Sequence, residues 1–196
     1  TLTIIISQSG ETADTLAALK EAKRLGSHTL SIVNVVGSSI ANASDDVIYT
    51  WAGPEIAVAT TKGYTTQLSV LYMIAIWAAR LLKTADSDRI ERVFDDLCRL
   101  PELIERVLTQ EPKIKELASR CGDPKSLFFI GRNIDYAVSL EASLKLKEIS
   151  YIHSEAYAAG ELKHGTISLI DDGMPVIAVA TQTDVIPKTI SNIVEV

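Results

Sequence analysis

Residues 4–15 read IIISQSGETADT, and the fold class can be predicted from this segment onward. Three isoleucines run directly into a group of hydroxyl, amide and glycine residues, and a helical pattern follows at once. A short, continuous, β-branched run that leads into a helix is typical of a buried parallel strand. The helix predicted over residues 12–25 ends at Gly26, because glycine commonly terminates helices.

The same order of elements continues along the chain. HTLSIVNV (28–35) predicts a second strand, SSIANASDD (38–46) a short helix and loop, and VIYT (47–50) a third strand. Strands that alternate with helices in this way indicate an α/β fold. We therefore expect a three-layer architecture, in which helices cover both faces of a doubly wound parallel sheet.

A helical pattern then runs from residue 62 to about residue 120, with expected interruptions at KTADSD (83–88), Pro101 and Pro112. Its most apolar part, LSVLYMIAIWAARLL (68–82), contains about fifteen residues, whereas a membrane-spanning helix needs about twenty. We expect a buried helix here and no membrane partner.

The third part of the chain returns to the strand and helix pattern. SLFFIGR (126–132) predicts a buried strand, residues 136–151 a long helix, and PVIAVA (175–180) another strand before a final helix. The order of elements again favours a parallel sheet.

Two segments suggest that one α/β unit occurs twice. TIIISQSGETADTLAAL and PVIAVATQTDVIPKTI both contain an apolar strand, a hydroxyl–Gln–hydroxyl tripeptide and a helix start. Such internal similarity is typical of tandem domains. We expect a first domain over residues 1–120, which includes the helical connector, and a second over residues 121–196. The first copy would lack its beginning and the second its end.

Composition excludes several classes of partner. The net charge of −6 comes from charges of both signs mixed along the chain, so a nucleic acid is not expected. Cys98 and Cys121 have no ligand-like spacing and no histidine motif is present, so we expect no metal site. Two unpaired cysteines fit a reducing, cytoplasmic compartment.

The polar turn after the first strand is a candidate anion site. Helix starts leave amide groups unpaired, and Ser7, Ser9 and Thr12 add hydroxyls while Gln8 adds an amide. Capping of the helix by Ser9 or Thr12 is the simpler alternative, but a cap needs one such residue. Because no Walker lysine or G-x-G-x-x-G motif is present, a small phosphorylated metabolite is favoured over a nucleotide.

The stretch EASLKLKEISYIHSEAYAAGELKHG (141–165) is the densest group of ionisable residues. Glu141, Lys145 and Glu148 lie at i, i+4 and i+7 of a predicted helix and share one face. Spacing alone leaves two readings open, a group that transfers protons and an exposed ion pair. His153 and His164 are, on spacing alone, ordinary packed or exposed histidines.

Three segments carry a family resemblance. SQSGETADT, VATTKGYTTQL and KLKEISYIHSEAYAAGELKHG closely resemble the isomerase half of the glutamine:fructose-6-phosphate aminotransferases, which is built from tandem SIS domains of flavodoxin-like fold. The resemblance runs over essentially the whole chain. It implies that Ser7, Gln8, Ser9 and Thr12 bind the phosphate of a hexose 6-phosphate.

The same resemblance implies further roles. Val58 and Thr60 would contact the sugar, although many members have serine in place of Thr60. Glu148 would be the general base that moves a proton between C1 and C2, and Lys145 would assist it. His164 would open the sugar ring from the neighbouring subunit, which makes a homodimer with a shared active site part of the mechanism.

In this family no cofactor is used, a glutaminase domain of the same longer chain supplies ammonia, and a lysine near the far end of the chain forms a Schiff base with the ketose. Both of these parts lie outside the 196 residues. Two alternatives remain, a regulatory SIS module that only binds a phosphosugar and a related isomerase or deglycase of amino-sugar phosphates. A module that only binds would not need Lys145, Glu148 and His164.

Overall fold

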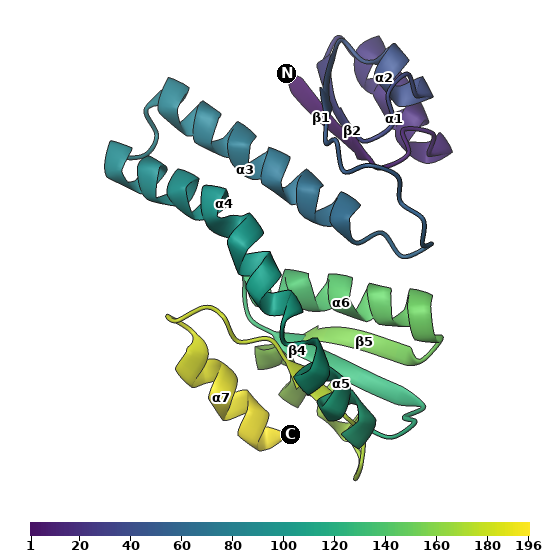
Figure 1. Cartoon of the computed structure of the whole chain (residues 1–196), viewed down its shortest axis with the longest axis vertical. Coiled ribbons are helices and arrows are strands. Elements are labelled where there is room, and N and C mark those ends of the chain that lie inside the picture. Colours follow the sequence, from purple (N-terminus) through teal and green to yellow (C-terminus); the bar gives the residue numbers. More distant parts are fainter. The chain divides into compact units, whose positions relative to one another are not determined.

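The computed structural model describes residues 1–196 as two compact units, Thr1–Leu108 and Thr109–Val196 (Figure 1). The expected division after residue 120 differs from this one by helix α5 (Glu111–Arg120), which belongs to the second unit.

The first unit begins with the predicted alternation of strands and helices. Its elements are β1 (Leu2–Ser7), α1 (Ala13–Arg24), β2 (His28–Val33), α2 (Ser39–Ala43) and β3 (Asp46–Tyr49). The three strands are parallel and lie in the order β1-β2-β3. The predicted strands and helices are thus confirmed, with ends that shift by one or two residues.

One face of this sheet carries the core of the first unit. Ile5 of β1 and Val33 of β2 pack with Leu19 of α1 and Ile40 of α2, and all four are at most 5% exposed. Each such side chain contributes about 1.5 to 3 kcal/mol through burial. The alternate residues of β1, including Ile4 and Ile6, point to the opposite face and stay 38% and 41% exposed.

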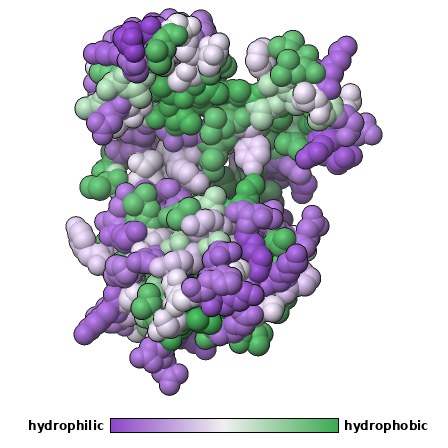
Figure 2. Space-filling model, turned by 180° about the vertical axis from the view of Figure 1, so that it is seen from behind, coloured by the Kyte–Doolittle hydropathy of each residue, from purple (hydrophilic) through white to green (hydrophobic).

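Helices α3 (Lys62–Leu82) and α4 (Ser87–Leu108) pack against each other as a hairpin (Figure 1). The expectation that residues 68–82 form a buried helix is wrong, because only Gly63 and Val70 of α3 are buried. A helix that is apolar on all sides needs neighbours on all sides, and within this chain α4 covers one side. Figure 2 shows apolar surface gathered in the upper part of the view, over this unit.

By length and composition alone, α3 is also the one helix in the structure that could cross a membrane.

The two prolines of the helical segment behave differently. The expected interruption at Pro101 is wrong, since α4 continues through it. Proline removes one backbone donor and costs about 3 kcal/mol in a helix interior, yet α4 runs through Pro101 from Ser87 to Leu108. Pro112 lies in the first turn of α5, where its missing N–H has no intrahelical acceptor to lose.

The second unit contains another parallel sheet, of order β5-β4-β6. Its elements are β4 (Ser126–Gly131), α6 (Ile134–Ser150), β5 (His153–Ala158), the 3₁₀ helices η1 (Ala159–His164) and η2 (Thr166–Leu169), β6 (Val176–Ala178) and α7 (Ile186–Glu195). The strands predicted at 126–132 and 175–180 are confirmed. Strand β5 was not predicted, because HSEAYA alternates polar with small residues and lacks an apolar run.

Both faces of this second sheet are covered. Helix α6 packs on β4 and β5, where the hydroxyls of Ser143 and Ser154 lie 2.9 Å apart in the interior. On the other face Ile130 packs with Leu162 of η1 and with Tyr157, whose ring also meets Phe128 edge-on. Figure 1 shows α6 on one side of β4 and β5 and α7 on the other.

A buried carboxylate joins α6 to the turn after β6. Asp135 is 1% exposed and accepts hydrogen bonds from Thr181 N (2.8 Å), Thr181 Oγ1 (2.5 Å) and Gln182 N (3.3 Å). Burial alone would raise the pKa of Asp135, but the bonds from Thr181 and Gln182 outweigh it and lower the pKa. In the second copy, the tripeptide that matches Ser7–Ser9 therefore already donates its hydrogen bonds to Asp135, a side chain of the same unit.

We expect Asp135→Asn to lower the free energy of unfolding by about 2 to 4 kcal/mol at pH 7, since an amide cannot accept all three bonds. A carboxyl of lowered pKa stabilises the fold above its unfolded pKa of about 4 and loses this effect as the pH falls further. Denaturant titrations at pH 7 and pH 3 should show the deficit of the variant shrinking at the lower pH. The exposed neighbour variant Asp184→Asn serves as control, and an equally stable Asp135→Asn protein would contradict the assignment.

Candidate functional site

The first amides of α1, which follow the β1–α1 turn, have no side-chain acceptor. Thr12 is the residue before the first turn of α1, yet its side chain makes no capping hydrogen bond. Its Oγ1 lies 3.3 Å from Ser7 Oγ instead. The first amides of α1 therefore have neither an intrahelical acceptor nor a side-chain cap. The capping alternative fails for Thr12, and the Ser7–Thr12 turn keeps the donors that an anion would need.

Two hydrogen bonds between residues close in sequence shape the Ser7–Thr12 turn. Ser7 Oγ accepts the Gly10 N–H at 3.0 Å, and Ser9 Oγ accepts the Glu11 N–H at 3.2 Å. Gly10 has a φ of 69°, and a Cβ at this position would overlap the side chain of Ser38. Glycine is required here for both reasons.

The start of α3 lies beside this turn. A Cβ on Gly63 would be 2.8 Å from Thr60 Cγ2 and 3.2 Å from Gln8 Cγ, so these two predicted residues are neighbours. Gly63 N–H donates to Glu55 Oε1 at 2.6 Å, a contact that the sequence did not predict. The side chain of Val58, by contrast, is 91% exposed.

The second unit brings the predicted lysine and glutamates together. Lys145 Nζ on α6 lies 2.5 Å from Glu148 Oε2 and 3.6 Å from Glu141 Oε1, which confirms their shared face. The three side chains are 20% to 28% exposed, so their charges are partly shielded from solvent. Burial lowers the pKa of Lys145, but the pairs with Glu148 and Glu141 outweigh it and raise the pKa above its usual value. Lys145 is therefore a cation at neutral pH.

The histidines lie on other elements. His164 ends η1, which is anchored by the buried Leu162, and its side chain is exposed without a hydrogen bond. The guanidinium of Arg132 packs against Gly160 of η1 and donates to Asn192 Oδ1 of α7 at 2.7 and 3.1 Å, which fixes η1 in its unit. His153 lies on β5, and its Nδ1 is 3.2 Å from Ser126 Oγ of the neighbouring strand β4.

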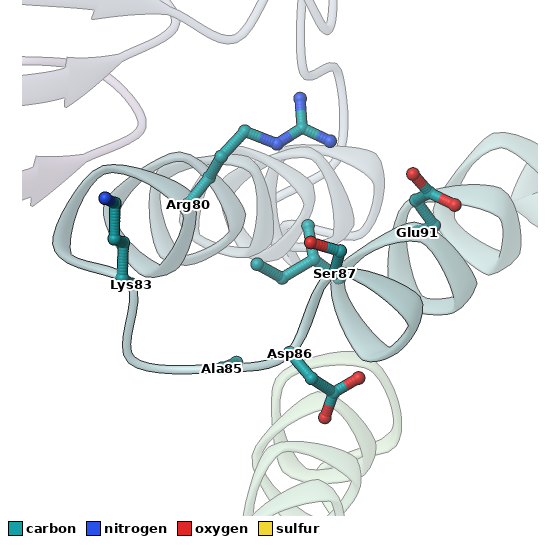
Figure 3. A pocket seen from close by; sticks show the side chains of 7 residues that line it. Arg80, Lys83, Ala85, Asp86, Ser87 and Glu91 are labelled. Atoms are coloured by element: carbon teal, nitrogen blue, oxygen red, sulfur yellow. The ribbon is translucent and has the colours of Figure 1, made fainter.

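A different pocket, of about 600 Å³, lies at the connection of α3 and α4 (Figure 3). Arg80 lies in the last turn of α3 and Lys83 directly follows this helix. Asp86 directly precedes α4 and Glu91 lies within it, and all four side chains are exposed. Asp86 Oδ1 accepts the Arg89 N–H at 2.7 Å, so the start of α4 is already capped. The guanidinium of Arg80 and the ammonium of Lys83 are exposed at this pocket, without an ion pair to Asp86 or Glu91. The structure also contains no group of three or more His, Cys, Asp or Glu residues arranged to hold a metal ion.

The fold and the hydroxyl-rich turn define a class of protein. The sequence model of the SIS domain family matches residues 1–77 and 122–196, and the chain belongs to this family. Its α/β architecture with parallel sheets is the SIS fold, as expected from the sequence.

Particular relatives are similar over the whole chain. It is 55% identical over 196 residues to the glutamine–fructose-6-phosphate aminotransferase (isomerizing) of Clostridium acetobutylicum. It is 57% identical over 195 residues to the protein of the same name of Caldanaerobacter subterraneus subsp. tengcongensis. The chain spans 32% of the length of each of these relatives.

A solved structure of a protein with a related name is also similar to this chain. The C-terminal domain of glucosamine-fructose-6-phosphate aminotransferase from Francisella tularensis superposes with a TM-score of 0.95 at 40% identity. The match covers 99% of this chain and 55% of that one.

Proposed function

We propose that this chain is the isomerase part of a glutamine:fructose-6-phosphate aminotransferase. The complete enzyme makes glucosamine 6-phosphate from fructose 6-phosphate and ammonia, which a glutaminase domain of the same longer chain releases from glutamine. The observation that carries the proposal is the cluster of Ser7, Ser9 and Thr12 hydroxyls at the uncapped start of α1, since α3, α6 and α7 also begin without a side-chain cap. The relatives at 55% and 57% identity support it.

In this proposal the Ser7–Thr12 turn binds the phosphate of the sugar. A hydrogen bond to a charged oxygen contributes roughly 1.5 to 3 kcal/mol, whereas the helix dipole contributes about 0.3 to 1 kcal/mol. The hydroxyls of Ser7, Ser9 and Thr12, the Gln8 amide and the backbone N–H groups therefore supply most of the affinity. Val58 and Thr60 contact the sugar beyond its phosphate.

Glu148 is the proposed general base. It takes a proton from C1 of the open-chain ketose derivative and returns it to C2, which produces the aldose. The Lys145 cation lies 2.5 Å from Glu148 Oε2, and it balances negative charge on the sugar while the proton is in transit. No cofactor is required for this step.

His164 is proposed to open the sugar ring in the active site of a neighbouring subunit. An exposed imidazole without a partner is free to reach another molecule, and histidine transfers protons readily near neutral pH. The functional unit is then a cytoplasmic homodimer with shared active sites. A purely regulatory SIS module would have no use for the Lys145–Glu148 pair, which favours the enzyme.

Replacement of Ser9 and Thr12 by alanine in the complete enzyme should raise the KM for fructose 6-phosphate by about 100-fold, since two bonds to a dianion are lost. Steady-state kinetics measures the change. The double variant Thr65→Ala, Ser69→Ala removes two hydroxyls that bond helix carbonyls of α3 and serves as control. An unchanged KM would remove the Ser7–Thr12 turn from the site.

Glu148→Gln should lower kcat at least about 1,000-fold while the enzyme still binds glucose 6-phosphate, because the amide fills the same space but accepts no proton. Single-turnover assays and a binding titration separate the two effects. Glu116→Gln on the exposed face of α5 is the matched control. Substantial turnover by the Glu148→Gln enzyme would refute the base assignment.

Mixed dimers test the shared site. Neither His164→Ala nor Glu148→Gln enzyme should be active alone, but a mixture should regain up to about a quarter of wild-type activity, because hybrid dimers then hold one intact site. The absence of any recovery after subunit exchange, verified by native mass spectrometry, would count against a site built from two subunits.

A further inference from the structure

Glu11 is a carboxylate inside a turn that is proposed to bind an anion. It directly precedes Thr12 and follows Gly10 in the Ser7–Thr12 turn. A negative charge so close to a phosphate dianion disfavours binding. A second role for this side chain must offset the repulsion if the proposed function holds.

The Glu11 carboxylate faces away from the turn and toward the start of α2. It accepts the Ser39 N–H at 2.8 Å through Oε1 and the Ser39 hydroxyl at 2.6 Å through Oε2, across 28 positions of sequence. The hydroxyl bond and then the backbone bond of Ser39 lower the pKa of Glu11, so the carboxylate is charged at neutral pH. Glu11 thus joins the β1–α1 turn to the β2–α2 turn by two charge-assisted bonds.

Backbone contacts continue this junction. The Ile40 N–H donates to the Gly10 carbonyl at 2.9 Å, and the Asn34 N–H donates to the Gln8 carbonyl at 3.1 Å. Backbone hydrogen bonds and the Glu11 side chain therefore both hold the β1–α1 turn against the β2–α2 turn.

Close packing under Gly10 confirms that the junction is tight. Ser38 is 3% exposed and lies where a Cβ of Gly10 would be, and its hydroxyl has no hydrogen-bond partner. A buried hydroxyl without a partner is unfavourable. This unfavourable free energy arises where the β1–α1 turn packs on the β2–α2 turn.

We propose that Glu11 is a positioning residue, whose bonds to Ser39 hold the Ser7–Thr12 turn in the conformation that receives the phosphate. This inference rests on the proposed function. Preorganisation of this kind lowers the cost of ordering a loop on binding. It acts on binding of the sugar phosphate and leaves the proton transfer unchanged.

The test uses the complete aminotransferase, with glucose 6-phosphate as the probe in calorimetric titrations and fructose 6-phosphate in kinetic assays. Glu11→Ala should raise the Kd and the KM about tenfold while kcat stays within about twofold. Ser39→Ala should have a smaller effect, because the backbone N–H remains. The double variant should be no weaker than Glu11→Ala alone, since both changes break one junction.

Glu21→Ala is the matched control. Glu21 is an exposed glutamate of α1 that binds Arg24 at 2.6 and 2.8 Å, so its removal changes the net charge equally without touching the turn. It should leave Kd and KM unchanged.

Three outcomes would overturn the inference. Tighter binding by Glu11→Ala would show that charge repulsion dominates. An unchanged Kd would show that the bonds between Glu11 and Ser39 do not affect binding. Additive effects of Glu11→Ala and Ser39→Ala would show that the two residues act separately. The Ser9→Ala, Thr12→Ala enzyme separates this result from a failure of the proposed function. Should that enzyme bind glucose 6-phosphate normally, the turn itself is not the phosphate site.

Discussion

The amides at the start of α1 depend on acceptors that the folded chain does not provide. Thr12 stands where a capping side chain would, yet its hydroxyl points to Ser7. The strand β1 fixes where this turn begins, and the junction with α2 fixes its shape. Such a group of donors suits an anion, and in the proposed function the phosphate of the sugar is that anion.

The two copies of the α/β unit treat the equivalent turn in opposite ways. In the second unit Asp135 supplies an internal carboxylate to the amides and hydroxyl of Thr181 and Gln182. In the first unit no acidic side chain does this, because Glu11 is bound to Ser39. The donors of this turn thus have an acceptor within their own unit in the second copy, whereas the first amides of α1 have no side-chain cap in the first. The Lys145–Glu148 pair lies in the second unit.

Local pattern was sufficient for most of the fold and for part of the site. The isoleucine run of β1 and the helix spacing of Lys145 and Glu148 depend on neighbours in sequence, so their structure could be predicted. Strand β5 was missed because its stability comes from pairing with β4, which no local apolar run reveals. The burial of α3 was misjudged because it depends on what packs around the helix. Long-range contacts such as that of Glu11 with Ser39 have no sequence signal at all.

A crystal structure of the complete enzyme with glucose 6-phosphate would show whether the Ser7–Thr12 turn binds the phosphate. We predict phosphate oxygens at about 3 Å from the hydroxyls of Ser9 and Thr12 and from the first amides of α1. A phosphate bound at another place, with the Ser7–Thr12 turn still empty, would contradict it.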